Sequence, residues 1–264
     1  TTCPHYWREG QDGESEEAFA SRCAQDLDDM IQSEGPETVA AFIAEPVMGA
    51  GGVVVPPATY WEKIQAVLAK YDILLIADEV ICGFGRTGNM FGSTTFDIKP
   101  DILTMSKQIT SSYFPFSAFM INDRVYQPIA DESGRIGVLG HGYTGGGHPV
   151  GAAVALENIK IIEERDLVAN AAERGAELQA GLTDLTSHPL VGEARGIGLI
   201  GALELIAPEG KSGDFAPGKL GAQMNAIMLR NGLISRNMTD AMAFCPPLIV
   251  GANDVREIIQ ITKK

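Results

Sequence analysis

Apolar positions near the start of the chain recur at the spacing of an α-helix. The positions that form this apolar stripe are Phe19, Cys23, Leu27, Met30 and Ile31. Apart from Ala20 and Ala24, the positions between them are polar or charged. The pattern therefore predicts a helix with one buried face and one solvated face.

Four short apolar runs follow and predict β-strands, at residues 39–44, 73–77, 101–105 and 116–121. The run at 73–77 is continuously apolar, which is typical of a strand covered on both faces in a parallel sheet. Between the first two runs, Thr59 and Glu62 have the spacing of a capping box, and apolar residues then recur on one helical face. Strands that alternate with helices predict an α/β domain with a mainly parallel sheet.

The second half of the chain has a different pattern. A largely buried helix is predicted over residues 149–164, and Asp166 could cap a long helix after it. A third helix is predicted between residues 220 and 228, with Gly232 at its C-terminal end. A final helix is predicted around residues 255–259. The predicted strands lie at 200–206, 233–235 and 242–244. This order indicates a smaller α+β domain, so we expect residues 1–154 to belong to the large domain and residues 155–264 to form the small one.

A charged residue follows the end of each of three predicted strands: Glu45, Asp78 and Lys107. Charged residues are common where strands reach the surface, so each of them alone is better explained by simple solvation. Ligands of open parallel sheets bind at the carboxyl ends of the strands, however, so the three together indicate one site with two carboxylates and an amine. An amine there can lose its charge through desolvation and attack a carbonyl. Pyridoxal 5'-phosphate requires such a lysine for a Schiff base and an acid for its pyridinium nitrogen.

Residues 83–88 (GFGRTG) match the G-x-G-x-x-G pattern of dinucleotide-binding loops. Two features argue against that function. Residues 78–82 separate the motif from the apolar run, and the residues after Gly88 do not predict the helix whose N-terminus would hold a pyrophosphate.

A second glycine-rich segment, residues 141–149, precedes a predicted helix. Its backbone N–H groups, the Thr144 hydroxyl and the helix N-terminus suit a phosphate group. His141 and His148 could bind a metal ion, but no acid or cysteine nearby would complete the ligand set.

The composition of the chain limits the kinds of molecule that it is expected to bind. The chain has 264 residues and a formal net charge of −14 at pH 7, so it repels phosphate backbones and anionic membrane surfaces. We therefore expect no nucleic-acid partner. No apolar run approaches the length of about 18 residues that spans a membrane, and no signal peptide is expected. Four scattered cysteines without zinc-ligand spacing favour a reducing, cytoplasmic location.

Five segments together resemble the class III aminotransferases, pyridoxal-phosphate enzymes of fold type I. The segments are AAFIAEPVMGAGGVVVPP (40–57), LLIADEVICGFGRTGNMF (74–91), KPDILTMSKQITSSYFPFSA (99–118), HGYTGGGHPVGAAVAL (141–156) and SRNMTDAMAFCPPLIV (235–250). They occur in the family's order. The resemblance implies the large α/β domain of fold type I, with a mainly parallel sheet, and a smaller C-terminal α+β domain.

The resemblance also implies roles for the matching residues. Lys107 would hold the cofactor as a Schiff base, and Asp78 would pair with the pyridinium nitrogen. Val80 would pack on the face of the ring, and Glu45 would support the hydrogen bonds beside it. Thr144 would bind the cofactor phosphate of the neighbouring subunit, which implies a homodimer with shared active sites.

Two features depart from the family pattern. Ile81 stands where many members have Gln, and Gly145-Gly146 replaces a common Tyr-Ser pair. Family members are also much longer, so this chain, which begins at Thr1 without Met, resembles the C-terminal portion of such an enzyme. If nothing supplies the preceding half, we expect weak cofactor binding and little turnover.

The implied activity is transfer of an amino group from an ω-amino acid or amine to a keto acid such as pyruvate. Arg236 would receive the substrate carboxylate, as in the branch of the family that acts on such compounds. Two alternatives remain open from the sequence. One is a different pyridoxal-phosphate reaction, such as aminomutation, racemisation or decarboxylation, and the other is a catalytically incomplete fragment.

Overall fold

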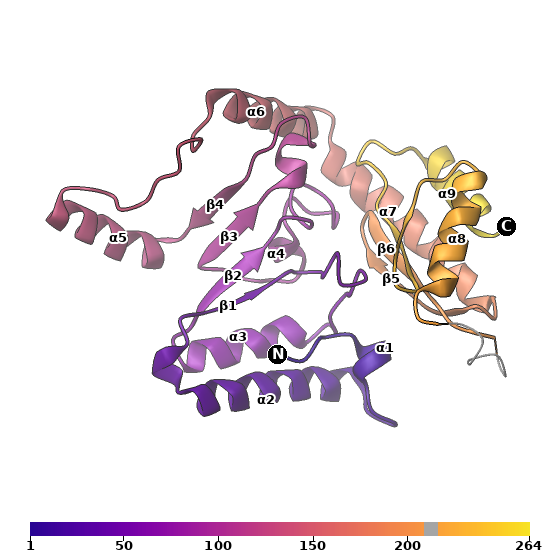
Figure 1. Ribbon diagram of the computed structural model, residues 1–264, viewed down its shortest axis with the longest axis horizontal. Coiled ribbons are helices and arrows are strands. Elements are labelled where there is room, and N and C mark those ends of the chain that lie inside the picture. Colours follow the sequence, from indigo (N-terminus) through magenta and orange to yellow (C-terminus); the bar gives the residue numbers. More distant parts are fainter. Residues whose placement is uncertain (209–215) are drawn as a thin grey trace.

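The computed structural model describes residues 1–208 and 216–264 (Figure 1). Its first sheet has the strand order β1-β2-β3-β4, formed by Ala41–Ala44, Leu74–Asp78, Ile102–Met105 and Ala118–Ile121. The first three strands run parallel, and β4 is antiparallel to β3. The predicted α/β architecture with a mainly parallel sheet is therefore confirmed.

The helices α2 (Glu16–Glu34) and α3 (Tyr60–Lys70) cover one side of this sheet. The short helices α1 (Tyr6–Glu9) and η1 (Pro36–Thr38) precede and follow α2, and α4 (Gly92–Thr95) follows β2. The helices α2 and α3 lie side by side along β1 (Figure 1). The apolar stripe of α2 packs on the buried Trp61 and Ile64 of α3, as its spacing predicts. Met30 is an exception, because its side chain is exposed.

Two details of this region differ from the sequence expectation. Thr59 precedes α3 as expected, but its hydroxyl is buried without a hydrogen-bond partner instead of capping the helix. In β2, Leu75 and Ala77 are buried whereas Leu74 and Ile76 are only half-buried. In the part of the chain that the structure describes, one face of β2 is therefore covered less than its apolar sequence predicts.

The second half of the chain builds an antiparallel sheet with the strand order β5-β6-β8-β7. Its strands are Val191–Ile197 (β5), Ile200–Leu205 (β6), Arg236–Met238 (β7) and Ala241–Phe244 (β8). The helices α7 (Leu167–Asp184), η3 (Leu185–Ser187), α8 (Lys219–Arg230) and α9 (Ala252–Thr262) accompany this sheet, whereas α6 (Pro149–Glu164) packs against η2 (Lys107–Thr110) and α7. Buried Leu178, Leu182 and Met242 belong to the core between α7 and this sheet.

Several predictions for this half need correction. The strand predicted at 233–235 is wrong, because pairing with β8 begins at Arg236. The helix at 149–164 is confirmed, but it is not largely buried, since Val150 and Leu156 are exposed. Asp166 occupies the N-cap position of α7 without a capping hydrogen bond from its side chain. The domain boundary expected after residue 154 falls inside α6 and stays a prediction.

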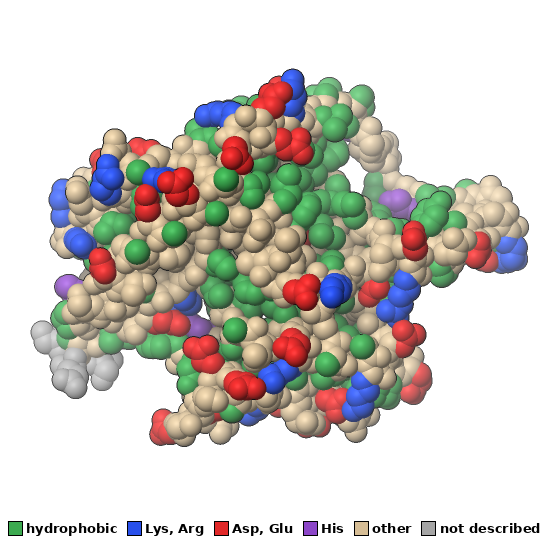
Figure 2. Space-filling model, turned by 180° about the vertical axis from the view of Figure 1, so that it is seen from behind, with side chains coloured by type: hydrophobic (Ala, Val, Ile, Leu, Met, Phe, Trp, Pro, Cys, Tyr) green, Lys and Arg blue, Asp and Glu red, His purple; other side chains and the backbone are tan. Residues whose placement is uncertain are grey.

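The helix α5 (Asp123–Ile136) and the segment that follows it project from the first sheet (Figure 1). Residues 134–150 are all exposed, and the exposed apolar side chains of the projection include Tyr126, Ile129 and Leu139. Figure 2 shows hydrophobic side chains gathered over the middle of the face seen there and reaching the projecting segment. No helix of the described residues combines the length and the apolar character needed to cross a membrane.

Candidate active site

Glu45, Asp78 and Lys107 lie at the carboxyl ends of three neighbouring parallel strands. Glu45 follows β1, Asp78 is the last residue of β2, and Lys107 begins η2 (Lys107–Thr110) after β3. Burial raises the pKa of the Glu45 carboxyl, as does the negative charge of Asp78, whereas a hydrogen bond from Gly49 and the positive charge of Lys107 lower it. Asp78 and Lys107 are therefore close enough for their charges to act on Glu45.

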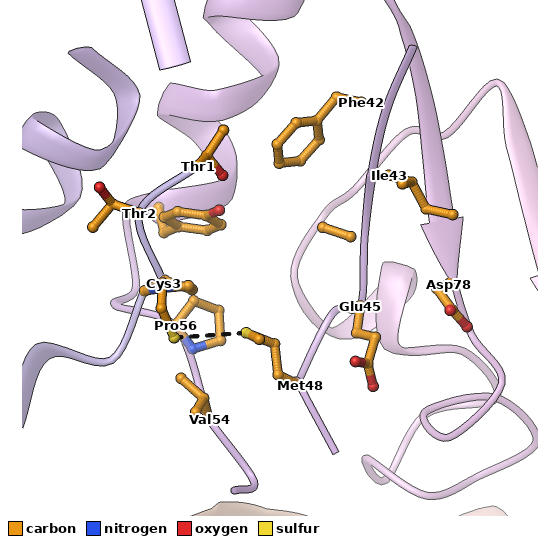
Figure 3. Close-up of a pocket in the computed structure, with 13 residues that line it drawn as sticks. Thr1, Thr2, Cys3, Phe42, Ile43, Glu45, Met48, Val54, Pro56 and Asp78 are labelled. Atoms are coloured by element: carbon orange, nitrogen blue, oxygen red, sulfur yellow. Dashed lines mark hydrogen bonds between the residues drawn. The ribbon is translucent and has the colours of Figure 1, made fainter. Parts of the chain in front are cut away.

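The two carboxylates are held by the turns that follow their strands. Asp78 Oδ1 accepts a hydrogen bond from the N–H of Val80 at 3.0 Å. Glu45 Oε2 accepts one from the N–H of Gly49 at 2.9 Å. Figure 3 shows the two side chains on adjacent strand ends. Among the hydrogen bonds of the described residues, none uses Asp78 Oδ2, so this oxygen can bind a cationic ligand group.

Lys107 occupies a backbone conformation that few lysines adopt. Its φ is 45°, and Ser111 and Ser112, which follow η2, also have positive φ values. Such conformations persist where the surroundings enforce them, often at functional sites. Here Asn158 of α6 donates to the carbonyls of Gln108 and Ile109 at 2.6 and 3.3 Å. The Lys107 side chain itself is exposed.

A pocket of about 360 Å³ lies between the start of the chain and the free edge of β1 (Figure 3). Thr1 to Pro4 form one wall, and Phe42, Ile43 and Tyr60 contribute to the apolar lining. Glu45 and Asp78 supply its acidic end. An apolar pocket with a few convergent polar groups is the usual form of a site for a small organic ligand.

The other two residues singled out by the sequence lie in exposed segments. Thr144 belongs to the exposed stretch after α5, and Arg236 is the exposed first residue of β7. Within the described residues, no hydrogen bond or ion pair links either of them to Glu45, Asp78 or Lys107. The structure therefore brings the three charged residues to neighbouring strand ends, whereas the roles of Thr144 and Arg236 stay predictions.

Sequence reasoning missed Glu79, the most deeply buried acid near the site. Its side chain is 0% exposed, whereas the preceding Asp78 is half-buried. The Glu79 carboxylate accepts hydrogen bonds from the N–H of Gly92 and from both the N–H and the hydroxyl of Ser93. The Glu79 carboxylate therefore accepts from the free N–H groups at the start of α4. Its role is to hold this segment in place rather than to bind a ligand.

The glycine motif at 83–88 serves as a junction with the second sheet's domain. A Cβ at Gly85 would lie 3.3 Å from Leu248, and one at Gly88 would lie 3.2 Å from Ala172. Arg86 donates to the carbonyls of Leu199 and Pro246 at 2.9 and 2.6 Å. Protein atoms therefore occupy the space beside these glycines, which argues further against a dinucleotide site.

The two histidines that suggested a metal site have separate partners. The His141 ring packs edge-on against Phe119 and Tyr143. His148 lies beside Phe114, and its Nδ1 accepts a hydrogen bond from the N–H of Val150 at 3.3 Å at the start of α6. These contacts explain both side chains without a metal ion.

Comparison with known proteins identifies the family of the chain. Residues 6–264 match the Aminotransferase class-III family. The chain is 48% identical over 265 residues to gamma aminobutyrate transaminase 1, mitochondrial, of Solanum lycopersicum, and the match covers 100% of this chain and 52% of that protein. It is 47% identical over 270 residues to the diaminobutyrate–2-oxoglutarate transaminase of Halomonas elongata, with coverages of 100% and 58%.

Solved structures give the same result. A transaminase with L-ala superposes with a TM-score of 0.97 at 64% identity, over 100% of this chain and 62% of that one. The omega transaminase from Pseudomonas jessenii in complex with PMP superposes with a TM-score of 0.94 at 57% identity. The superposition covers 99% of this chain and 58% of that one. This chain thus spans between 52% and 62% of the length of these relatives. Because the family match extends over residues 6–264, the chain belongs to the class-III aminotransferase family.

Proposed function

We propose that this chain carries the lysine-bearing part of a pyridoxal-phosphate-dependent transaminase. The substrates would be an ω-amino acid or amine as amino donor and a keto acid such as pyruvate as acceptor. The single observation that carries the proposal is the placement of Lys107 and Asp78 at neighbouring strand ends, one offering an amine and the other a carboxylate. Membership of the class-III aminotransferase family supports the same reaction class.

The side chains present fit the cofactor's chemistry. Asp78 has one carboxylate oxygen fixed by Val80, which leaves the second for a pyridinium N–H. The exposed Lys107 amine is accessible to an aldehyde. We propose that Val80, whose N–H binds Asp78, packs against the ring and that Glu45 supplies a further acceptor beside the two groups.

When bound, pyridoxal phosphate supplies an aldehyde that accepts amino groups and a cationic ring that draws electrons from the reacting carbon. The chain's own residues supply the rest. Asp78 holds the proton on the ring nitrogen by pairing its negative charge with it. Lys107 Nζ would hold the cofactor covalently and, when free as an amine, would accept the proton that leaves the substrate carbon.

The remaining parts of the proposal concern substrate, partner and location. We propose that Arg236 binds the substrate carboxylate and that Thr144 binds the cofactor phosphate of a second subunit in a homodimer. The exposed apolar side chains near Thr144, among them Leu139 and Tyr143, support contact with such a subunit. A cytoplasmic location is proposed because the four cysteines are free.

A catalytically incomplete chain is the second candidate. The exposure of Lys107 and the greater length of the relatives favour it, because further residues of such proteins would be needed to cover the site. An absorbance scan distinguishes the two candidates. With pyridoxal phosphate added, a yellow band that β-alanine removes supports a working site, whereas a band that resists amine donors supports an incomplete one.

Matched variants make the scan specific. Lys107→Ala should abolish the band, while Lys99→Ala, which removes another exposed lysine, should keep it. Asp78→Asn should weaken cofactor binding, while Asp97→Asn should not. Dependence of continued turnover on pyruvate then separates transamination from the other pyridoxal-phosphate reactions. A band of equal intensity in the Lys107→Ala protein would contradict the proposal.

A further inference from the structure

Five charged or titratable side chains form a cluster that joins the start of the chain to the second sheet: His5, Arg8, Glu193, Arg195 and Glu204. His5, Arg195 and Glu204 are buried, Glu193 is partly buried and Arg8 is exposed. The ring of His5 lies 2.9 Å from Glu193 Oε2. Arg195 donates to Glu193 at 2.5 Å and to Glu204 at 2.7 Å, and Arg8 pairs with the other oxygen of Glu204. No single stretch of sequence indicates this cluster, because its members lie far apart along the chain.

A metal ion does not suit this cluster. The ligand atoms of His5, Glu193 and Glu204 lie within 4.8 Å of one another. However, the guanidinium groups of Arg195 and Arg8 already contact these carboxylates and balance their charge. A divalent cation would meet two positive groups and no net negative charge. The cluster is therefore an ion-pair network.

Arg195 also reaches beyond the cluster to the loop after β1, which we define as the 48–54 loop. Its Nε donates to the carbonyls of Gly52 and Val53 at 3.0 and 3.1 Å, and its Nη2 donates to Gly52 at 2.6 Å. The Arg195 side chain is 6% exposed, so water does not compete for these charge-assisted bonds. Gly52 has a φ of +121°, and a Cβ there would lie 3.3 Å from Arg195 Nη2, which explains why glycine occupies this position.

The 48–54 loop holds a strained backbone. Met48 and Val54 pair at its ends, with N–H to carbonyl distances of 3.1 and 2.9 Å. Between them, Val53 has a φ of 54°, which a β-branched residue adopts only where its surroundings enforce it. Arg195 binds the carbonyls on both sides of the Val53 Cα, so it is the group placed to enforce this conformation.

Gly49 connects the loop to the candidate site. Its carbonyl accepts hydrogen bonds from the N–H groups of Gly52 and Val53 at 3.2 and 3.0 Å. Its own N–H donates to Glu45 Oε2 at 2.9 Å. An unbroken series of hydrogen bonds thus runs from Arg195 through the loop to Glu45.

We propose that Arg195 is a positioning residue for the transaminase site: it holds the 48–54 loop in the conformation in which Gly49 fixes the Glu45 carboxylate beside Asp78 and Lys107. The inference rests on the proposed function in one respect only, which is the role of the Glu45 carboxylate in the transaminase site. The effect on the loop itself does not require the cofactor.

The first test measures amide hydrogen exchange of the 48–54 loop without cofactor. Arg195→Lys keeps a positive charge in the cluster but lacks the forked donors, so it should fold and yet leave the loop less restrained. Exchange at Val53 and Val54 should rise by about tenfold. Arg8→Ala is the matched control, because it removes a partner of Glu204 without touching the loop. If Arg195→Lys fails to fold, the double variant Arg195→Met, Glu204→Gln is used in its place. This variant removes both charges of the Arg195–Glu204 ion pair together.

The second test measures the pH at which the visible absorbance of the protein loaded with pyridoxal phosphate changes. A fixed Glu45 carboxylate stabilises a protonated chromophore, so both Arg195→Lys and Glu45→Gln should lower the midpoint. Arg195→Lys should cause no further shift in a Glu45→Gln protein. A full shift in that background, or unchanged loop exchange in the first test, would overturn the inference. A wild-type protein without absorbance would instead contradict the proposed function and leave the exchange result in force.

Discussion

Replacement of Glu79 should destabilise the fold far more than replacement of its neighbour Asp78. The Glu79 carboxylate is fully buried and accepts three hydrogen bonds, at 2.9, 2.6 and 2.6 Å, from Gly92 and Ser93. In Glu79→Ala the Ser93 hydroxyl can rotate to another acceptor, but two backbone N–H groups stay buried without one. At about 1–3 kcal/mol for each orphaned donor, with a small cavity added, the free energy of unfolding should fall by about 3–5 kcal/mol.

Urea unfolding followed by circular dichroism measures this loss directly. Glu79→Gln should fall between the wild type and Glu79→Ala, because the amide oxygen can still accept from Ser93 while its NH₂ group faces another donor. Asp78→Ala is the matched control and should cost no more than about 1 kcal/mol, since it removes one half-buried hydrogen bond. The reasoning is refuted if Asp78→Ala is the more destabilised protein or if Glu79→Ala unfolds at the wild-type midpoint.

Two further predictions concern titratable groups. In the native protein the exposed Cys245 should react with iodoacetamide first, whereas Cys82, whose pKa burial raises, should react only after unfolding. Peptide mapping of the labelled protein checks this order, and equal labelling of both thiols would contradict it. Arg22 lowers the pKa of the Glu14 carboxyl from 4.5 to about 2. Because the folded pKa is the lower one, the contribution of this pair to stability is present above pH 4.5 and is lost as the pH falls towards 2. In Arg22→Ala the midpoint of Glu14 in an NMR titration should return towards 4.5, and a midpoint that stays near 2 would contradict the assigned cause.

Elements with strong local patterns could be predicted from the sequence. The stripe of α2 encodes the helix and, apart from Met30, its buried face, whereas the apolar run of β2 encodes the strand but not which face is covered. The helix α5 was missed because none of its residues is buried and it contains Pro128, although its apolar residues Val125, Ile129 and Ile136 recur at helical spacing. The strand β5 was missed because the charges of Glu193 and Arg195 suggest a surface, whereas the structure pairs them with distant residues.

Some residues of the candidate site could likewise be predicted from the sequence and others could not. The strand-end rule found Glu45, Asp78 and Lys107 because position at the end of an apolar run is a local signal. The buried role of Glu79 depends on donors in α4, which no local pattern reveals. Thr144, on the exposed segment after α5, stays a prediction, because its proposed role depends on a second subunit.

The most direct test of the central claim locates the lysine that binds the cofactor. The protein is incubated with pyridoxal phosphate, reduced with borohydride, digested and mapped by mass spectrometry. The account predicts a phosphopyridoxyl group on Lys107, absent from the Lys107→Ala protein. Modification of a different lysine instead, or of none, would contradict it.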